Sequence, residues 1–279
     1  MRMLKFKKIK TANLSEFPEI IFNHKIKGSW ELFKKKAYHY LLKKSFYNFL
    51  NWPIIKQTMF VDNANYLNYE YNFLCNSERK YLSLMSEDLW GKPTPSDLDL
   101  ATSGNRIHHT YLLARYELET KKNLNNFKVI FEFGGGYGSF ARLIHKLNFS
   151  GIYIIFDFDI FNIIQFNYLE KFGYQIFVQP EKVNGNGIYL FNDISTLNKF
   201  ISNLEINLFI ATWSLSESNI ETRDKINNIF LNSEHYLIAF QSEFDSINNI
   251  EYFTNKLFNK NGIVNKLDHM GNGQNYIFI

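Results

Sequence analysis

The sequence predicts a doubly wound α/β domain that follows an N-terminal helical region. Two observations lead to this prediction. After residue 127, short apolar runs rich in β-branched and aromatic residues alternate with helical patterns, whereas no strand-type alternation of any length precedes that point. Strands that alternate with helices of ~10–15 residues indicate a mostly parallel sheet with helices on both faces.

The two textures divide the chain near residue 120. We expect residues 1–120 to form a helical cap that contributes to the substrate region, and residues 121–279 to form the sheet domain. Apolar residues at helical spacing predict helices over Trp30–Trp52, about Tyr66–Leu89 and about Ile107–Glu119. The runs expected to be strands are Val129–Phe133, Ile152–Phe156, Gln175–Val178, Ile188–Phe191, Leu208–Thr212, Tyr236–Phe240 and Tyr276–Ile279.

Composition excludes several classes of protein. Apolar residues make up 46% of the 279 residues and aromatic residues 18%, so the chain can bury a large core and is not disordered. A net charge of +4 excludes a histone-like or tail-driven binder. The single cysteine, Cys75, excludes an internal disulfide framework and fits a reducing compartment. With no apolar signal region and no stretch of about 18 uncharged apolar residues, we expect a cytoplasmic protein without a transmembrane segment.

Basic side chains are concentrated at the N-terminus. Residues 1–50 contain twelve Lys or Arg and three Glu, a net charge of +9. This stretch is either a surface for an anionic membrane or a phosphate-bearing substrate, or a solvated helix face. Its aromatic residues Phe6, Trp30 and Tyr38 fall at helical core spacing, so packing explains them better than base stacking. We therefore expect no nucleic-acid partner.

The strongest motif is the segment Val129–Arg142, which reads as a buried strand, a glycine turn and the start of a helix. Such a turn lets a ligand approach the backbone closely and offers N–H groups at a helix N-terminus. The turn therefore predicts a nucleotide-like cofactor. The turn residues expected to contact it are Gly134, Gly135, Gly136, Tyr137 and Gly138.

Two cofactors are compatible with this turn. The spacing Gly136-x-Gly138-x-x-Ala141 satisfies a relaxed dinucleotide fingerprint, which would indicate an NAD-dependent oxidoreductase. Glu132, however, gives the spacing E-x-G-x-G-x-G. A carboxylate at the strand tip repels a pyrophosphate but attracts S-adenosylmethionine (SAM), which carries an ammonium and a sulfonium. The charge of Glu132 therefore favours SAM.

Acidic residues follow two further strands. Asp157 ends the second strand about 20 residues beyond the glycines, where an acid binds ribose hydroxyls, and we expect Phe158 beside it to contact the cofactor. Asp159 is the expected N-cap of a helix over Ile160–Phe172. For Asp193, which follows the strand Ile188–Phe191, adenine contact and helix capping both remain open.

These motifs together resemble a known family. The segments FEFGGGYGSFARL, IIFDFDIFNIIQFNYLEKFG and NLFIATWSLSES are similar to class I SAM-dependent methyltransferases, and specifically to bacterial sugar O-methyltransferases, over roughly residues 90–279. The resemblance implies a Rossmann-like sheet of seven strands whose last strand, Asn275–Ile279, is antiparallel. It implies a sugar or nucleotide-sugar substrate from a capsule, lipopolysaccharide or other surface-glycan pathway. The residues it implies for SAM are Glu132, Gly134, Gly136, Gly138 and Asp157.

The chemistry should gather at the carboxyl edge of the sheet. Ligands of open α/β sheets lie outside the carboxyl ends of the strands, so we expect Trp213 and Ser214 to converge with the cofactor residues. Methyl transfer to a sugar hydroxyl benefits from a general base. Glu217, in the family-like pattern Ser214-x-x-Glu217, is the first candidate for the base or for a hydroxyl ligand. Its alternative role is the cap of a helix over Ile220–Phe230.

Histidines supply the remaining candidates. His269 lies in a glycine-rich turn before the last strand and is the second candidate for catalysis. His108, His109 and Tyr111 open the helix Ile107–Glu119 and, with Ser214, are expected to bind substrate, one histidine facing inward and one outward. No metal is expected, because no HxH, HExxH or Asp-rich cluster is present. A catalytically silent SAM-fold subunit and a homodimer both remain compatible with the sequence.

Overall fold

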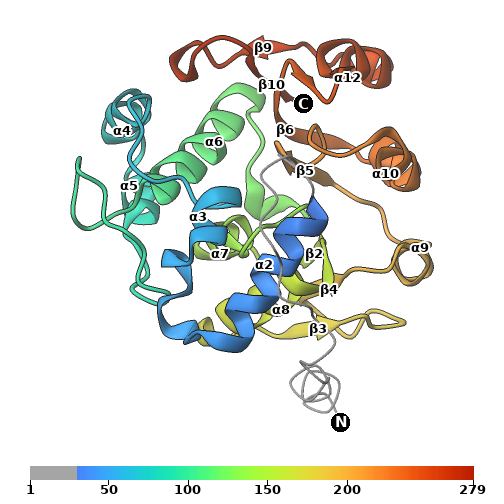
Figure 1. Cartoon of the computed structure of the whole chain (residues 1–279). Coiled ribbons are helices and arrows are strands. Elements are labelled where there is room, and N and C mark those ends of the chain that lie inside the picture. Colours follow the sequence, from blue (N-terminus) through green and yellow to red (C-terminus); the bar gives the residue numbers. More distant parts are fainter. Residues whose placement is uncertain (1–29) are drawn as a thin grey trace.

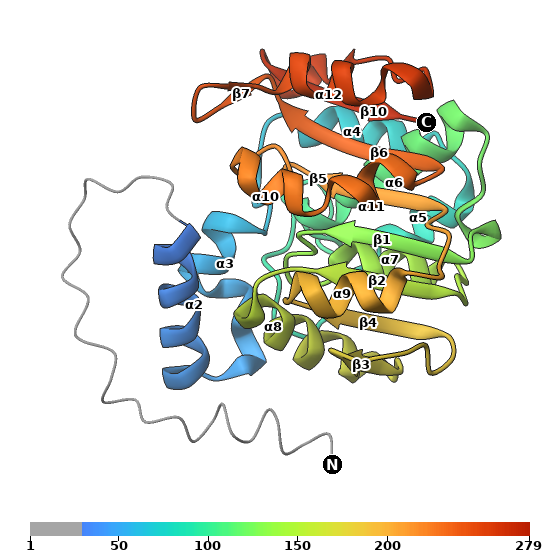
Figure 2. The same ribbon diagram turned by 90° about the vertical axis from the view of Figure 1, so that its right-hand side faces the viewer.

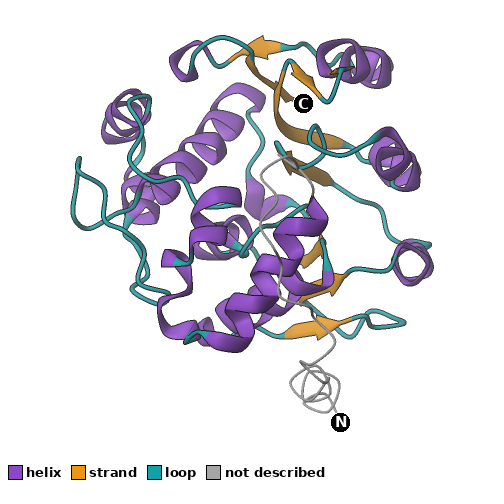
Figure 3. Cartoon of the chain, viewed as in Figure 1, coloured by secondary structure: helices purple, strands orange, loops and turns teal. Residues whose placement is uncertain are grey.

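A computed structural model of the chain describes residues 30–279, which fold around one eight-stranded sheet (Figures 1 and 3). The strand order is β3-β4-β2-β1-β5-β6-β10-β9. All neighbours in it are parallel except β10, which is antiparallel to β6 and β9. The strands are β1 (Val129–Phe133), β2 (Ile152–Phe156), β3 (Ile176–Val178), β4 (Gly187–Phe191), β5 (Leu208–Thr212), β6 (His235–Gln241), β9 (Asn265–Lys266) and β10 (Gln274–Phe278).

The structure confirms the predicted fold class, a mostly parallel Rossmann-like sheet with an antiparallel last strand. The seven predicted strands are all present within a few residues of their expected bounds. The sheet has one strand more than predicted, because β9 joins its edge beyond β10. This strand, like the hairpin of β7 (Glu243–Phe244) and β8 (Ile247–Asn248), is two residues long. Two residues are too few to show the alternation that identifies a strand.

Helices cover both faces of the sheet, as Figure 1 shows. Alternate residues of each strand point to opposite faces; in β1, Ile130 packs with the helices of one face and Phe131 with those of the other. The first face carries α6 (Gly104–Thr120), α7 (Ser139–Lys146) and α8 (Asp159–Leu169), and the second carries α9 (Ile194–Ile201), α10 (Ile220–Lys225), α11 (Asn227–Asn232) and α12 (Asn249–Leu257).

The helices before α6 are shorter than predicted. The pattern over Trp30–Trp52 forms α2 (Trp30–Lys43) and a 3₁₀ helix (Phe46–Asn51). Pro53 then begins α3 (Pro53–Thr58), because a proline at the first helical position loses no hydrogen bond. The second predicted helix is divided into α4 (Leu67–Cys75) and α5 (Arg79–Met85).

These N-terminal helices share one hydrophobic core with α6, α7 and α8. In Figure 2, α2 and α3 lie beside the end of the sheet at which the parallel strands finish. Within residues 30–279, no helix is both long and apolar enough to span a membrane. Seven of the basic side chains of residues 1–50, and Phe6, lie outside the described residues, so the expected membrane or phosphate contact of that stretch stays a prediction.

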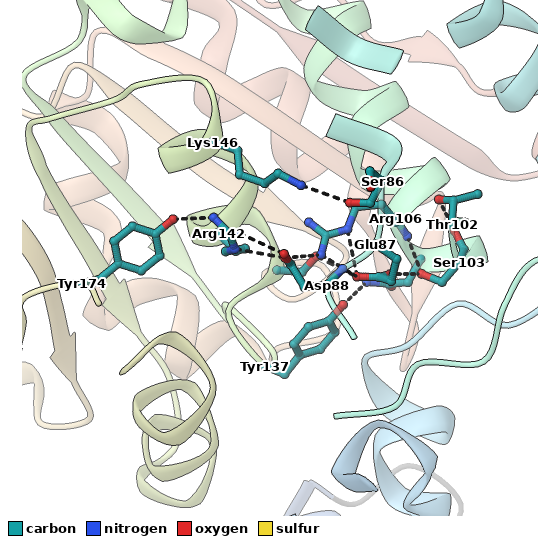
Figure 4. A network of polar contacts seen from close by, with 12 residues as sticks. Ser86, Glu87, Asp88, Thr102, Ser103, Arg106, Tyr137, Arg142, Lys146 and Tyr174 are labelled. Carbon is teal, nitrogen blue, oxygen red and sulfur yellow. Dashed lines mark hydrogen bonds and ion pairs between the residues drawn. The ribbon is translucent and has the colours of Figure 1, made fainter. Parts of the chain in front are cut away.

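A buried polar network joins α6 to α7 through the segment before α6 (Figure 4). The Arg106 guanidinium, which is fully buried, pairs with Glu87 and with Asp88 at 2.9 Å. Asp88 pairs in turn with Arg142 of α7, also at 2.9 Å. Next to Arg106, Asn105 donates to the hydroxyl of Tyr137 at 2.8 Å. The network therefore holds Tyr137, a residue of the glycine turn, from the side of α6.

Candidate functional site

A cavity of about 870 Å³ lies outside the carboxyl ends of β1, β2, β4 and β5, and α2, α3 and α6 close its other sides. Most of the residues proposed from the sequence line it. They are His108, His109, Glu132, Gly134, Gly135, Gly136, Tyr137, Asp157, Phe158, Asp193, Trp213, Ser214 and Glu217. Gly138, Tyr111 and His269 are not among its lining residues. The structure therefore brings together the groups of four separate strand ends, as the topology requires.

The glycine turn presses against Ser214. Gly134 has φ +72°, and a Cβ atom there would lie 2.3 Å from the Cβ of Ser214. Only glycine fits this backbone position without a clash. The Ser214 hydroxyl donates to the carbonyl of Phe133, so Ser214 fixes the turn while it also lines the cavity. Gly138, at φ +96°, is the N-cap of α7.

Glu132 is a buried carboxyl group without a cation. It is 2% exposed, accepts a hydrogen bond from the Tyr153 hydroxyl at 2.9 Å, and forms no ion pair within residues 30–279. Burial, with a smaller contribution from Asp157, raises the pKa of Glu132 to about 8, although the Tyr153 hydrogen bond opposes the rise. A buried carboxylate of this kind is stabilised by a positively charged ligand.

Asp157 ties the end of β2 to the glycine turn. Its Oδ2 accepts from the Gly136 N–H at 3.1 Å and from the Gln165 amide at 2.9 Å, while its Oδ1 accepts from the Phe158 N–H at 2.8 Å. Burial nevertheless raises the pKa of Asp157 to about 7. Gln165 was not among the residues proposed from the sequence. Its signal was an amide side chain, one of three in the otherwise mostly apolar α8.

The other two acids of this edge act at helix starts. Asp193 accepts from the Thr196 N–H at 2.7 Å as the N-cap of α9, which lowers its pKa; it lines the cavity as well, so a contact with adenine stays a prediction. Asp159 is not an N-cap, because Phe158 holds that position in α8. Asp159 instead accepts a hydrogen bond from the Tyr38 hydroxyl of α2.

Trp213 and Glu217 form the turn that follows β5. Trp213 has φ +62°, unusual for a bulky side chain, and its indole N–H donates to Gln274 at 2.7 Å. The Glu217 N–H donates to the Trp213 carbonyl at 3.0 Å. Burial raises the pKa of Glu217 to about 7, and its side chain has no hydrogen-bond partner in the described part of the chain. The capping alternative for Glu217 is wrong, because Asn219 caps α10.

Both histidines of α6 line the cavity, whereas we expected one of them to face outward. The ring of His109 lies 4.4 Å from that of Phe140, and burial holds the pKa of His109 well below its usual range, which keeps it neutral. His108 contacts the carboxyl group of Glu70 in α4, which His269 also contacts from the opposite end of the chain. Glu70 is fully buried and was missed from the sequence; its signal was that it is the single acid of the segment that forms α4.

Acidic groups dominate the charge of the cavity. The two lysines that line it, Lys56 and Lys225, each pair with an acid outside the lining, Asp62 and Glu221, at 2.9 and 2.8 Å. The acidic lining residues are Glu31, Glu132, Asp157, Asp193, Glu217 and Asp245. No cluster of three or more His, Cys, Asp or Glu able to hold a metal ion occurs in the part of the chain that the structure describes. The cavity therefore favours ligands that are cationic or rich in hydroxyl groups.

The chain is similar to several solved structures. No family model and no curated protein matches the sequence. TrmK of M. capricolum, solved with S-adenosyl-homocysteine, is similar over 59% of this chain and 66% of its own, at 14% identity and a TM-score of 0.39. Magnesium protoporphyrin IX methyltransferase (ChlM) of Synechocystis PCC 6803, with bound SAM, is similar over 77% of this chain and 96% of its own, at 10% identity and a TM-score of 0.42. Precorrin-6y C5,15-methyltransferase of Geobacter metallireducens GS-15 is similar over 70% of this chain and 96% of its own, at 10% identity and a TM-score of 0.41.

Proposed function

We propose that the protein is a SAM-dependent methyltransferase that methylates a sugar hydroxyl, on a nucleotide-linked or surface-glycan precursor. The observation that carries the proposal is Glu132. It is a buried carboxyl group directly before a glycine turn, and no side chain within residues 30–279 neutralises it. The ammonium of SAM would stabilise the ionised form of Glu132, whereas the pyrophosphate of NAD would disfavour its ionisation.

The proposed cofactor contacts follow the edge of the sheet. Glu132 and the backbone of Gly134–Gly136 receive the methionine portion of SAM, Asp157 the ribose hydroxyls, and Phe158 and Asp193 the adenine. When bound, SAM supplies an electrophilic methyl group on a sulfonium. The remaining task of the protein is to orient the acceptor oxygen, exclude water and remove a proton.

The proposed acceptor site lies on the side of β5 and α6. Trp213 offers an aromatic face for the apolar face of a sugar ring, and Glu217 offers a carboxylate that can accept a hydrogen bond from the sugar hydroxyl. Both lysines of the lining are already paired, so the sugar ring, not a phosphate, suits this end of the cavity. The basic stretch of residues 1–50, with its net charge of +9, would then hold the phosphate of a nucleotide sugar.

A transfer assay tests the proposal. The full-length protein is incubated with methyl-labelled SAM and UDP-glucose, UDP-galactose or GDP-mannose, and labelled sugar is measured. We expect label in at least one sugar and no label with Glu132→Gln. Glu217→Gln should lower kcat by about tenfold, because the amide still accepts from the sugar hydroxyl but carries no charge.

The control is Glu205→Gln, since Glu205 is exposed and lies outside the cavity lining; it should behave as the wild type. Label found only in a protein or RNA acceptor would contradict the sugar assignment while leaving methyl transfer intact.

A further inference from the structure

Glu70 links two histidines that lie 161 positions apart in the sequence. Its Oε1 and Oε2 lie 2.9 and 3.0 Å from Nδ1 of His108, and its Oε1 lies 2.9 Å from Nε2 of His269. Burial opposes ionisation of Glu70, but the two histidines outweigh it and hold the pKa of Glu70 below its usual value. Because the carboxylate only accepts, each of these ring nitrogens donates its proton to Glu70.

This arrangement determines which nitrogen of His108 is free. With Nδ1 donating to Glu70, neutral His108 has its lone pair on Nε2. Nε2 of His108 has no hydrogen-bond partner within residues 30–279. It is not fully enclosed by protein, in contrast to Nδ1 of the neighbouring His109, which is enclosed and has no partner. His108 lines the cavity, and with Nδ1 engaged by Glu70 its Nε2 is the ring nitrogen left for a ligand of the site.

His108 also lies at the acceptor end of the cavity. Its ring centroid is 5.2 Å from that of Trp213, and Trp213 is followed directly by Ser214, which contacts the glycine turn. The carboxyl group that lines this side of the cavity, that of Glu217, has no partner among the described residues to fix its orientation. His108, by contrast, is fixed through Glu70, and a general base acts efficiently only when it is held in place.

We propose that His108 is the catalytic base of the methyl transfer and that Glu70 and His269 are positioning residues that hold it. This inference rests on the function proposed above. The acceptor hydroxyl gives its proton to Nε2 of His108 while its oxygen bonds to the methyl carbon and the carbon–sulfur bond breaks. The positive charge that leaves the sulfonium ends on the imidazolium, where the Glu70 carboxylate stabilises it. His269 keeps the carboxylate in position by donating to Oε1.

The ring tautomer of His108 tests the pair without any substrate. Nitrogen NMR of the full-length protein, with ¹⁵N-labelled histidine and His108 assigned from His108→Gln, reports which ring nitrogen carries the proton. In the wild type we expect the proton on Nδ1. In Glu70→Gln and His269→Gln we expect the Nδ1–H signal to weaken or the two tautomers to mix. A wild-type His108 with its proton on Nε2 would overturn the proposal.

Kinetics then test the role of the base, using the sugar nucleotide methylated in the transfer assay. His108→Gln should lower kcat by about 10²–10⁴-fold, and Glu70→Gln by about tenfold or more, while calorimetric affinity for SAM stays within about twofold. The matched control is His145→Gln in α7, a half-buried histidine outside the cavity lining that bonds a backbone carbonyl. Full activity in His108→Gln, with SAM bound, would overturn the proposal. Failure of the wild type to bind SAM would instead overturn the proposed function.

Discussion

At the scale of single residues, the site depends on carboxyl groups that the fold buries. Glu132, Asp157 and Glu217 all have raised pKa values, about 8, 7 and 7, and in each case burial is the main cause. Groups perturbed in this way and placed in one cavity are typical of functional sites. Ionisation of these buried groups should lower the stability of the cofactor-free protein by a measurable amount.

The first prediction concerns Glu132 and pH. Its pKa in the folded protein is raised from 4.5 to about 8, so ionisation disfavours the folded state, and this destabilisation grows as pH rises from about 4.5 to about 8. Glu132→Gln keeps an acceptor for Tyr153 but cannot ionise. In urea denaturation without cofactor, we expect the variant to gain stability over the wild type between pH 5 and pH 8, on the order of 3 kcal/mol. A difference that does not change with pH would contradict the buried, unpaired carboxylate.

The second prediction isolates the close approach at the glycine turn. Gly134 and Gly173 have nearly the same φ, +72° and +76°, but a Cβ at Gly134 would meet Ser214, whereas a Cβ at Gly173 would meet nothing within 4 Å. Gly173→Ala should cost about 1 kcal/mol from backbone strain alone. Gly134→Ala should cost about 3 kcal/mol, because a steric clash is added. Equal losses in the free energy of unfolding would show that Ser214 yields to the new atom.

The residue scale also shows what the sequence could predict of the site. Glu132, Asp157, Trp213, Ser214 and Glu217 line one cavity as expected, because each lies within five residues of the end of a recognisable strand. Glu70 and Gln165 escaped, because their roles depend on partners that lie 38 and 29 positions away along the chain. A helical pattern shows which face is buried; it does not show which distant polar group that face meets.

At the scale of elements, α2 closes the cavity beside α8. Trp30 lines the cavity and packs on Phe158 and Phe161, with ring centroids 6.0 and 6.2 Å apart. The Tyr38 hydroxyl of α2 donates to Asp159 of α8, and burial together with Asp159 raises the pKa of Tyr38. These contacts attach α2 to the region proposed for adenosine.

The third prediction tests that attachment. Tyr38→Phe removes the hydroxyl that bonds Asp159 and should cost about 1 kcal/mol locally, so we expect hydrogen exchange of the α2 amides to quicken by about fivefold, with α6 unchanged. The control is Tyr47→Phe, since Tyr47 is exposed and its hydroxyl has no hydrogen bond to any described residue. Unchanged exchange in α2 would mean that its apolar contacts alone hold it.

Periodicity predicted the helical regions better than their breaks. The pattern over Trp30–Trp52 continues through Ser45, whose side chain caps the following 3₁₀ helix, because a change of direction does not interrupt the spacing of buried residues. The same holds where Asn76–Glu78 separates α4 from α5. The strands were located well, since each buried run is bounded by turn residues.

At the scale of the whole molecule, the network of Arg106 joins α6 and the segment before it to α7 (Figure 4). Burial works against the charge of Asp88, but Arg106 and Arg142 hold the pKa of Asp88 below its usual value. Removing one partner from a buried ion pair leaves the other charge uncompensated, which is strongly destabilising.

The fourth prediction follows from this network. Arg106→Leu should lower the free energy of unfolding by about 3–5 kcal/mol. Lys225→Ala, which breaks the exposed pair with Glu221, should leave it almost unchanged, because solvent screens the pair. Urea denaturation at neutral pH measures both. An Arg106→Leu protein as stable as the wild type would show that the network adds nothing to folding.

The most direct test of the account is calorimetric titration of the full-length, cofactor-free protein with SAM, S-adenosylhomocysteine, NAD and NADP, repeated on Asp157→Ala and Glu132→Gln. We expect about micromolar binding of the first two ligands, loss of that binding in both variants, and no binding of the dinucleotides. Binding of NAD without SAM, or SAM affinity unchanged in Glu132→Gln, would contradict the central claim that this acidic cavity is built for a cationic cofactor.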